Sequence, residues 1–501
     1  MNFIIKILAG LIGLFVLTNL TFCKKNKFNT DQDAVVQFSQ DSVIFDTVFT
    51  SIGSATQNFR VRNTGKQKIK ISSIYLAGGK SSPFIINVDG AKGTTFDDIE
   101  IAGNDSIYVF VQVNVNPTNA SSPMIISDQI VFITNGNEQK VNLEAWGQDA
   151  YYHKPSDALY FKDGSYLAYS YVNEHTQAYT LVGSEYIWKN DKPHVVYGYL
   201  VVDSAQHLRI PEGTKVYMNY KAGIWVLPGG QIQVLGKKGN EVVFQGVRRE
   251  KDFADDPGQW DRIWINEGSE FNKIDYAIIK NGYIGVQAEQ FGQDTNLIKF
   301  KKLTITNTKI QNMSMWGLYG LYYNIIGGNN VISNCQEHSV NFLLGGYYEF
   351  YHCTFANYWK KDKPREKPTL NINNYSEGQT LPLVAYFGNC IIDGKLDNEL
   401  TLDIKPSTQF PVTYTFSSCW IKTSTNTSDA TKFMNIVKGT KTSILEYKDI
   451  DAYDFEPKSS ETRIKNFTSP DAQADAQLFP QDINGVSRNT ANVTAGAYEV
   501  P

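Results

Sequence analysis

Short apolar runs alternate with turn residues between positions 35 and 148. In Phe59-Arg60-Val61-Arg62 the apolar side chains alternate with arginines, and Ile69-Lys70-Ile71 repeats this pattern. A period of two with one polar face is typical of a sheet that is buried on one side. The runs that predict strands are 42–49, 57–63, 69–76, 84–88, 106–114, 125–134 and 140–145. We therefore expect a seven-stranded β-sandwich over residues 35–148.

A second pattern of β runs fills residues 191–501, after a Tyr-rich connector at 149–190 in which few periods are clear. Turns such as Pro211-Glu212-Gly213 and Leu227-Pro228-Gly229-Gly230 separate the runs, and helical periodicity is absent. The first six runs are 195–202, 208–210, 215–218, 223–226, 231–235 and 241–245. The fold class predicted for the chain is therefore all-β.

One β unit then returns with different residues. Its copies are 274–281, 303–312, 331–335, 351–357, 388–392 and 417–421. They lie roughly 20 to 40 residues apart, and self-similarity at such a period is the signature of a solenoid. Only the stacking of successive coils would bury the inner face of such a domain.

Four cysteines fall in these units, namely Cys335, Cys353, Cys390 and Cys419. If they occupy equal places in successive coils, they stack about 4.8 Å apart along one wall. We expect reduced cysteines in the core, because a buried thiol packs as a small hydrophobe. The alternative is one or two disulfides, which an exported protein would permit.

Two resemblances follow from these residues. Residues 45–49, 59–65 and 99–115 resemble a Hydin-like (ASH-type) domain of the immunoglobulin fold, which implies binding or spacer duty without catalytic residues. Residues 199–245, Gly258-Gln259-Trp260-Asp261-Arg262 and the ending at 482–499 resemble the right-handed parallel β-helix of pectate-lyase-like proteins, as found in exported Bacteroidota proteins. That fold hosts lyases, hydrolases, adhesins and scaffolds, so it implies no single activity.

The N-terminus has the pattern of a lipoprotein leader. Residues 1–22 combine a positive start with an apolar run of about 14 residues, which is too short to span a bilayer comfortably. Leu20-Thr21-Phe22-Cys23 resembles a bacterial lipobox, although Phe22 stands where a small residue is usual. We expect Cys23 to carry the lipid, residues 23–34 to form a tether, and the protein to lie at the outer membrane with its facing open. The alternative is a plain signal peptide or an uncleaved anchor.

Charge excludes one class of partner. The net charge of −4 is spread along the chain without a basic stripe. Nucleic-acid binding depends on clustered Lys and Arg that neutralise phosphates, so no nucleic-acid partner is expected.

No catalytic, cofactor or metal site is indicated. The sequence contains no G-x-S-x-G, H-E-x-x-H or C-x-x-C motif. The acidic cluster at 252–256 is expected in a solvated loop, Asp261-Arg262 as a surface ion pair, and His153 and His175 as packing residues. We therefore predict no cofactor and a role without catalysis.

Aromatic residues suggest a softer hypothesis. Nine gather within 316–359, and an exposed row of rings would suit a glycan, whose apolar faces stack on aromatics. The alternative is that these rings pack inside the solenoid or cover it. The candidate platform comprises Trp316, Tyr319, Tyr322, Tyr323, Tyr347, Tyr348, Tyr351, Tyr358 and Trp359.

Three functions stay open at this point. The first is a cell-envelope lipoprotein that binds or scaffolds, with glycans as candidate ligands of the solenoid face. The second is a polysaccharide lyase or hydrolase, which needs acids and a base in one groove. The third is a structural subunit of an outer-membrane protein assembly, which needs a large exposed apolar patch.

Overall fold

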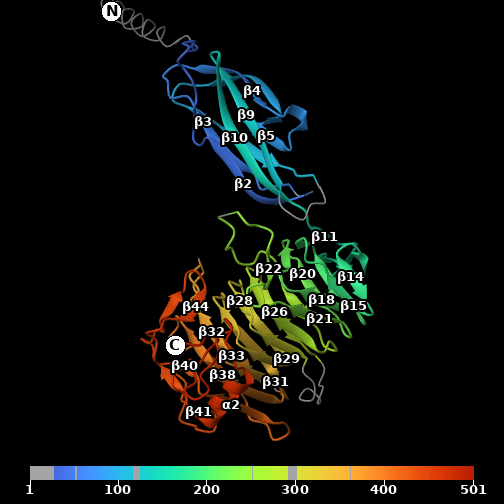
Figure 1. Ribbon diagram of the computed structural model, residues 1–501, viewed down its shortest axis with the longest axis vertical. Coiled ribbons are helices and arrows are strands. Elements are labelled where there is room, and N and C mark those ends of the chain that lie inside the picture. The colour runs from blue at the N-terminus through green and yellow to red at the C-terminus, as the bar shows by residue number, and fades with distance from the viewer. Residues whose placement is uncertain are drawn as a thin grey trace, which may run out of the picture. The chain divides into compact units, whose positions relative to one another are not determined.

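The computed structural model shows a nearly all-β chain in two compact units, Met1–Asp149 and Ala150–Pro501 (Figure 1). It describes residues 27–50, 53–116, 124–250, 252–291, 302–361, 363–377 and 379–500. The predicted leader at 1–22 and the predicted lipid-bearing Cys23 lie outside these residues. Among the described residues, no helix is long and apolar enough to cross a membrane.

The first unit packs two five-stranded sheets around one apolar core. Its pairings are antiparallel, apart from the parallel pair at β2 and β10. One sheet contains, in spatial order, β1 (Gln37–Phe38), β3 (Gln57–Arg62), β8 (Ser106–Val113), β5 (Phe84–Val88) and β6 (Ala91–Gly93). The other contains β2 (Ser42–Phe49), β10 (Asn137–Gln148), β9 (Met124–Thr134), β4 (Ile69–Leu76) and β7 (Thr95–Ile101), and a 3-10 turn lies at η1 (Gly79–Ser81).

Alternation explains this sandwich. In β8, Val109, Val111 and Val113 are fully buried, whereas Tyr108 and Phe110, which alternate with them, are exposed. The predicted bounds of β2, β4 and β5 are confirmed. The edge strand β7 was not predicted, because its sequence Thr-Phe-Asp-Asp-Ile-Glu-Ile mixes acids into the apolar pattern.

The second unit contains an eleven-stranded sheet in which every neighbouring pair is parallel. Its strands, in spatial order, are β11 (Tyr151–His153), β16 (His194–Val196), β19 (Lys215–Met218), β22 (Val242–Gly246), β25 (Ala277–Lys280), β28 (Lys309–Gln311), β30 (Val331–Ser333), β32 (Thr354–Asn357), β37 (Ile391–Gly394), β40 (Trp420–Lys422) and β42 (Val437–Gly439).

A nineteen-stranded sheet completes this unit, and its pairings are parallel outside two N-terminal hairpins. The hairpins are β12 (Asp157–Tyr160) with β13 (Tyr166–Tyr171) and β14 (Tyr179–Val182) with β15 (Glu185–Trp188). The other strands are β17 (Tyr199–Val202), β18 (His207–Pro211), β20 (Gly223–Val226), β21 (Gln231–Leu235), β23 (Ile263–Ile265), β24 (Asn272–Asp275), β26 (Ile284–Glu289), β27 (Leu303–Thr306), β29 (Trp316–Gly328), β31 (Val340–Tyr351), β33 (Leu370–Asn373), β36 (Leu383–Gly388), β38 (Leu400–Asp403), β39 (Val412–Ser417) and β41 (Phe433–Met434).

Chain order and pairing show how these sheets are built. The successive strands β16, β17 and β18 pair in parallel with β19, β20 and β21, which follow one circuit later. The next circuit adds β22, β23 and β24 in the same way. Inward side chains therefore stack in register, and they form one core that runs from Val172 to Phe433. The strands follow one another from green to red in Figure 1.

Two stretches of the chain differ most from the sequence expectation. The run predicted at 195–202 is divided into β16 and β17, because Gly198 between them adopts a left-handed φ of +61° and turns the chain. Residues 149–190, expected as a connector, form β11 to β15 and the 3-10 turn η2 (Val172–Glu174). Within this stretch β11 pairs with β16, and β13 pairs with β17.

The cysteine prediction is correct for three residues and wrong for the fourth. Cys353, Cys390 and Cys419 each precede a strand of the eleven-stranded sheet, at aligned positions in neighbouring strands. The backbone N–H of Cys353 donates to Cys390 Sγ at 3.5 Å, and that of Cys390 donates to Cys419 Sγ at 3.2 Å. Cys335 instead follows its strand, β30, so it lies at the opposite end of that strand. All four are buried and free.

Asparagine and threonine continue this ladder. The N–H of Asn330 donates to Cys353 Sγ at 3.4 Å, and the N–H of Thr308 donates to Asn330 Oδ1 at 3.0 Å. The residue that precedes each member of this stack has a left-handed φ, as at Asn307, Asn329 and Asn389. Asn tolerates this conformation better than most residues, so the recurrent Asn marks a corner that stacks from coil to coil.

The chain after β42 leaves the parallel sheets, although the sequence assigned all of 191–501 to one repetitive domain. It forms the antiparallel hairpin of β43 (Tyr447–Asp449) and β44 (Asp454–Pro457), the helix α2 (Pro470–Leu478) and a C-terminal tail. A further small hairpin joins β34 (Tyr375–Ser376) to β35 (Gln379–Thr380). Helix α2 was not predicted, although Ser469 as N-cap followed by Pro470 at the first position is a recognisable start signal.

Candidate binding cleft

The predicted aromatic platform does not form one exposed row. Tyr319, Tyr322, Tyr323, Tyr348, Tyr358 and Trp359 are buried, while Trp316, Tyr347 and Tyr351 are half-buried. Tyr348 stacks on Phe342 with ring centroids 3.8 Å apart, inside the core. Of the nine predicted platform residues, only the three half-buried rings could contact a glycan.

The half-buried members are themselves engaged. Tyr347 OH donates to the carboxylate of Glu349. The ring of Tyr351 lies 5.6 Å from that of Phe479 and 5.5 Å from that of Tyr386. Trp316 lies 4.5 Å from Tyr319. These contacts bind the rings to their own sheet and to the C-terminal segment.

A cleft of about 810 Å³ lies elsewhere, at the beginning of the parallel unit. The β12–β13 hairpin supplies Phe161 from its loop and Tyr166 from the start of β13, and their exposed fractions are 48% and 65%. The turn after β19 supplies Tyr220 at 69%, and the turn after β25 supplies Tyr283 at 40%. The cleft therefore presents exposed rings from the β12–β13 hairpin and from two turns whose strands, β19 and β25, are separated by β22.

Polar groups line the same cleft. Tyr199 OH donates to the carboxylate of Asp261, and Arg262 Nε donates to Asp261 Oδ1 at 2.9 Å. Burial, and then the Asp261 charge, raise the pKa of the Tyr199 phenol, so it stays a protonated donor. Arg262 also donates to Gln287, and its guanidinium lies 5.6 Å from the ring centre of Tyr283. Charged groups in fixed orientations thus lie beside apolar ring faces.

Stacked indoles support these groups. Trp225 and Trp264 occupy paired positions in β20 and β23, with ring centres 5.0 Å apart and planes within 10°. Trp264 Nε1 donates to Glu289 Oε1 at 2.7 Å, and Asn266 Nδ2 donates to the same oxygen at 2.9 Å. The Arg262 guanidinium lies 5.8 Å from the centre of the Trp264 ring. This contact fixes its orientation together with its hydrogen bonds to Asp261 and Gln287.

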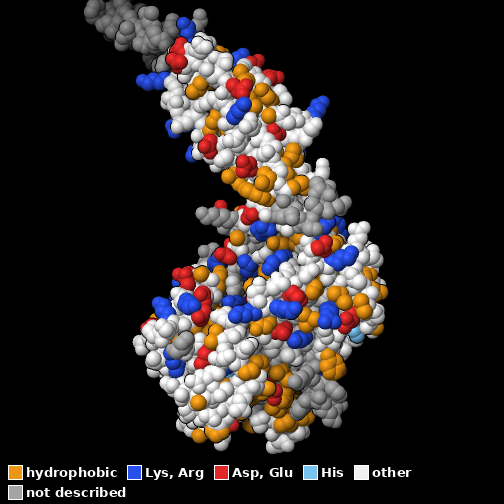
Figure 2. All heavy atoms as spheres, in the orientation of Figure 1, with side chains coloured by type: hydrophobic (Ala, Val, Ile, Leu, Met, Phe, Trp, Pro, Cys, Tyr) orange, Lys and Arg blue, Asp and Glu red, His pale blue; other side chains and the backbone are white. Residues whose placement is uncertain are grey.

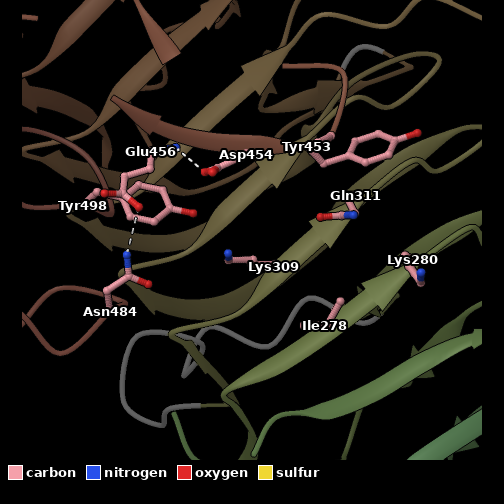
Figure 3. Close-up of a pocket in the computed structure, with 10 residues that line it drawn as sticks. Ile278, Lys280, Lys309, Gln311, Tyr453, Asp454, Glu456, Asn484 and Tyr498 are labelled. Carbon is pink, nitrogen blue, oxygen red and sulfur yellow. Dashed lines mark hydrogen bonds between the residues drawn. The ribbon is translucent and has the colours of Figure 1, made fainter. Parts of the chain in front are cut away.

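A second hollow, of about 450 Å³, differs in character (Figure 3). It lies between β25, β28 and the C-terminal segment, and its polar lining includes Lys280, Lys309 and Glu456. Asn484 Nδ2 donates to Glu456 Oε2 at 3.3 Å. Tyr498, which also lines it, is only 2% exposed. The other ring that lines it, Tyr453, is half-buried, so this hollow offers less exposed ring surface than the cleft.

Other candidate chemistry is structural. Within the described ranges, no group of three or more His, Cys, Asp or Glu side chains is placed to hold a metal ion. His153 and His175 pack together with ring centres 4.7 Å apart. Asp261 and Arg262, expected as a surface pair, are mostly buried at the cleft. Lys, Arg, Asp and Glu are interspersed over the face shown in Figure 2.

Sequence reasoning missed the cleft because its rings are far apart in the chain. Phe161 and Tyr166 lie in the stretch expected to be a connector, and Tyr220 and Tyr283 stand alone in turns. A search for local aromatic density favours 316–359 instead. Gly258-Gln259-Trp260-Asp261-Arg262 was the one available signal, since four of its five residues line the cleft.

Comparison with known proteins assigns no activity. No protein-family model and no curated protein matches the chain. A structure of a family 123 glycoside hydrolase from Clostridium perfringens is 10% identical with a TM-score of 0.16; the match covers 22% of this chain and 23% of that enzyme, less than a quarter of either. The ASH/PapD-like domain 7 of human CEP192 is 11% identical with a TM-score of 0.17, covering 24% of this chain and 87% of that domain. The E. coli chaperone DraB is 10% identical with a TM-score of 0.16, covering 27% and 80%.

Proposed function

We propose that the chain is an exported lipoprotein of the bacterial cell envelope that binds glycans without catalysis. In this proposal an immunoglobulin-like sandwich serves as spacer, and a right-handed parallel β-helix presents the binding surface. The regular addition of three parallel strands per circuit supports the β-helix, and the two packed five-stranded sheets support the sandwich. Lipid attachment at Cys23 and an outer-membrane location belong to the same proposal.

The cleft is the observation that carries glycan binding. Sugars offer apolar ring faces and many hydroxyls, so they need aromatic surfaces with oriented hydrogen-bonding groups close by. Tyr166, Tyr220 and Tyr283 supply exposed surfaces, and Asp261 with Arg262 supplies the oriented polar groups. These side chains belong to a stacked scaffold, so little ordering is required on binding.

A glycan array with residues 27–501 tests this function. Tyr220→Ala should weaken binding to the retained glycans roughly tenfold, equivalent to about 1.4 kcal/mol. Tyr108→Ala is the matched control, because Tyr108 is 46% exposed, belongs to the first unit and is not among the residues that line the cleft. Equal binding by wild type and Tyr220→Ala, or no glycan bound at all, contradicts the proposal.

The lyase or hydrolase alternative is tested with the same glycans. Each retained polymer is incubated with the protein, and shortened products are sought by mass spectrometry. Binding without shortened products supports the non-catalytic role, whereas chain cleavage that Asp261→Asn abolishes supports the enzyme.

A structural subunit of an outer-membrane assembly is the second candidate. Leu159, Tyr160, Leu181 and Val182, in the two N-terminal hairpins, are exposed by 44%, 75%, 53% and 55%. Contiguous exposed apolar patches mark interaction surfaces, whereas single exposed apolar residues are ordinary. Cross-linking in the cell envelope from position 160 would identify a protein partner if this candidate is correct.

A further inference from the structure

We infer that the cleft selects saccharides that bear an anionic group, carboxylate or sulfate, and that Lys221 is the residue that selects them. This inference rests on the proposed glycan binding and adds a ligand class to it. The cleft has three charged lining residues, Lys221, Asp261 and Arg262.

The charge balance of the cleft favours an anion. Asp261 and Arg262 form an ion pair with 2.9 Å between Oδ1 and Nη2, so their charges largely cancel. Asp261 also accepts from Tyr199, and Arg262 also donates to Gln287. Lys221 is exposed, its Nζ lies 5.5 Å from the ring centre of Tyr220, and none of the ion pairs found between described residues includes it. One positive charge is therefore left for a ligand.

The backbone conformation of Lys221 also supports a role in ligand binding. Lys221 has a left-handed φ of +60°, which is unfavourable for a long side chain. Gly and Asn tolerate this conformation best, and Gly198 and Asn281 adopt it in other turns of the same unit. Lys221 therefore carries backbone strain that Gly or Asn would carry less of, and such strain is found at positions that serve a ligand.

The stacking of coils sets the length of the ligand. The exposed rings Tyr220 and Tyr283 lie in the turns after β19 and β25, and these two strands are separated by β22 alone in the eleven-stranded sheet. Neighbouring parallel strands lie about 4.8 Å apart, so these two steps span roughly 10 Å. This length accommodates an oligosaccharide that runs along the stacking direction, with its anionic group beside Lys221.

The test compares anionic and neutral saccharides on wild type, Lys221→Gln, Lys221→Arg and Lys221→Gly. The defined probes are an oligoglucuronate and the matching neutral oligoglucose, added to a glycan array that contains sulfated and unsulfated pairs. The inference predicts that retained glycans are anionic and that their binding weakens with added salt. Lys221→Gln should weaken this binding roughly three- to tenfold, and Lys221→Arg should retain most of it.

Lys221→Gly separates selection from a structural role. Glycine relieves the left-handed strain, so its urea unfolding midpoint should rise or stay equal while anionic binding falls. A lower midpoint together with weaker binding would show that Lys221 supports the fold instead. Glycans that bind through Tyr220 but equally well with or without charge overturn the anion inference alone. Failure of every glycan to bind overturns the proposed function and the inference with it.

Discussion

At the residue scale, one backbone carbonyl determines which ring nitrogens carry protons in a pair of buried histidines. His194 Nε2 lies 2.7 Å from the Lys189 carbonyl oxygen, which can only accept, so this nitrogen carries the proton. The bare Nδ1 of neutral His194 then accepts from His153 Nε2 at 2.9 Å. His153 Nδ1 is left bare, buried and without a hydrogen-bond partner among the described residues. Protonation of His194 Nδ1 would remove the acceptor of this hydrogen bond, and protonation of His153 Nδ1 would create a buried charge without a partner among the described residues.

Acid should therefore weaken the start of the parallel unit. Burial lowers the pKa of His194 to about 4 and lowers that of His153 further. Unfolded histidines take up protons below about pH 6.5, so this stability is present above that pH and is lost as the pH falls towards about 4. His153→Phe keeps a ring beside Trp188 and removes one titrating group. Its unfolding free energy should fall less steeply between about pH 7 and 4.5, by roughly 1–3 kcal/mol.

Urea unfolding followed by tryptophan fluorescence measures this slope. His207→Gln is the control, since the half-exposed His207 lies outside the pair. Identical slopes for wild type and His153→Phe would show that the histidine pair is not the acid-sensitive element.

The cysteines give a second prediction at this scale. Burial raises the pKa of Cys335 to about 12 and raises that of Cys390 further, so neither forms a reactive thiolate near neutral pH. Folded protein spanning residues 27–501 should leave all four thiols unmodified by a thiol reagent, and the same protein in denaturant should yield four. Two or fewer thiols in the denatured, unreduced protein would support the disulfide alternative.

The cysteines also show how far sequence reasoning reaches. Cys353, Cys390 and Cys419 were correctly aligned because each lies between a polar turn residue and an apolar strand. Cys335 follows Ser333-Asn334, and a motif match cannot distinguish the beginning of such a strand from its end. The aromatic cluster failed for a related reason, because local density does not tell which side of a sheet a ring faces.

At the element scale, the packing of helix α2 depends on two glycines, which leave room for it because they have no side chain. It packs against the nineteen-stranded sheet, where a Cβ at Gly328 would lie 2.0 Å from the Phe479 ring and one at Gly388 would lie 2.0 Å from Asp475 Oδ2. Neither glycine has a left-handed φ, so space and not backbone freedom requires them. Gly388→Ala should displace α2 and cost roughly 1–3 kcal/mol of unfolding free energy, measured in urea. Unchanged stability, with α2 equally protected from proteolysis, would contradict this packing.

The same helix carries a pH dependence of opposite sign to that of the histidines. Burial raises the pKa of Asp475 to about 7, and Tyr386 OH donates to its Oδ2 at 2.8 Å. The folded state thus binds this proton more tightly than the unfolded state, and the ionised form destabilises the protein above about pH 7. Asp475→Asn retains an acceptor for Tyr386 and should stabilise the protein at about pH 8 by roughly 1–3 kcal/mol, with little effect near pH 4.

Urea unfolding at the two pH values tests this expectation, with Asp471→Asn as the control on the same helix. Asp471 lies in the first turn, where a carboxylate favours the helix, so its loss should not stabilise. A stabilising effect of Asp475→Asn that is equal at both pH values would show that its ionisation is not the cause.

At the scale of the whole molecule, register connects fold to function. Val201, Trp225, Trp264 and Gln287 occupy paired positions in consecutive parallel strands, and the turns that carry Tyr220 and Tyr283 depend on this stacking. The high content of β-strand and the recurrence of a β unit along the chain could be predicted from sequence. Both leave signals within a few neighbouring residues, namely alternation of apolar and polar side chains and recurring Asn turns. The cleft could not be predicted, because it depends on which turns meet across coils.

The pairing of successive coils is the central claim, and spin labels test it most directly. Gln233, Lys273 and Thr304 are half-buried and occupy paired positions in β21, β24 and β27. With cysteines at two of these positions in protein lacking residues 1–26, electron paramagnetic resonance should show strong dipolar broadening for 233 with 273. Broadening for 233 with 304 should be weaker, since that pair is separated by one further spacing of about 4.8 Å. Absence of broadening for 233 with 273, or stronger broadening for 233 with 304, would contradict the stacked architecture and the cleft built on it.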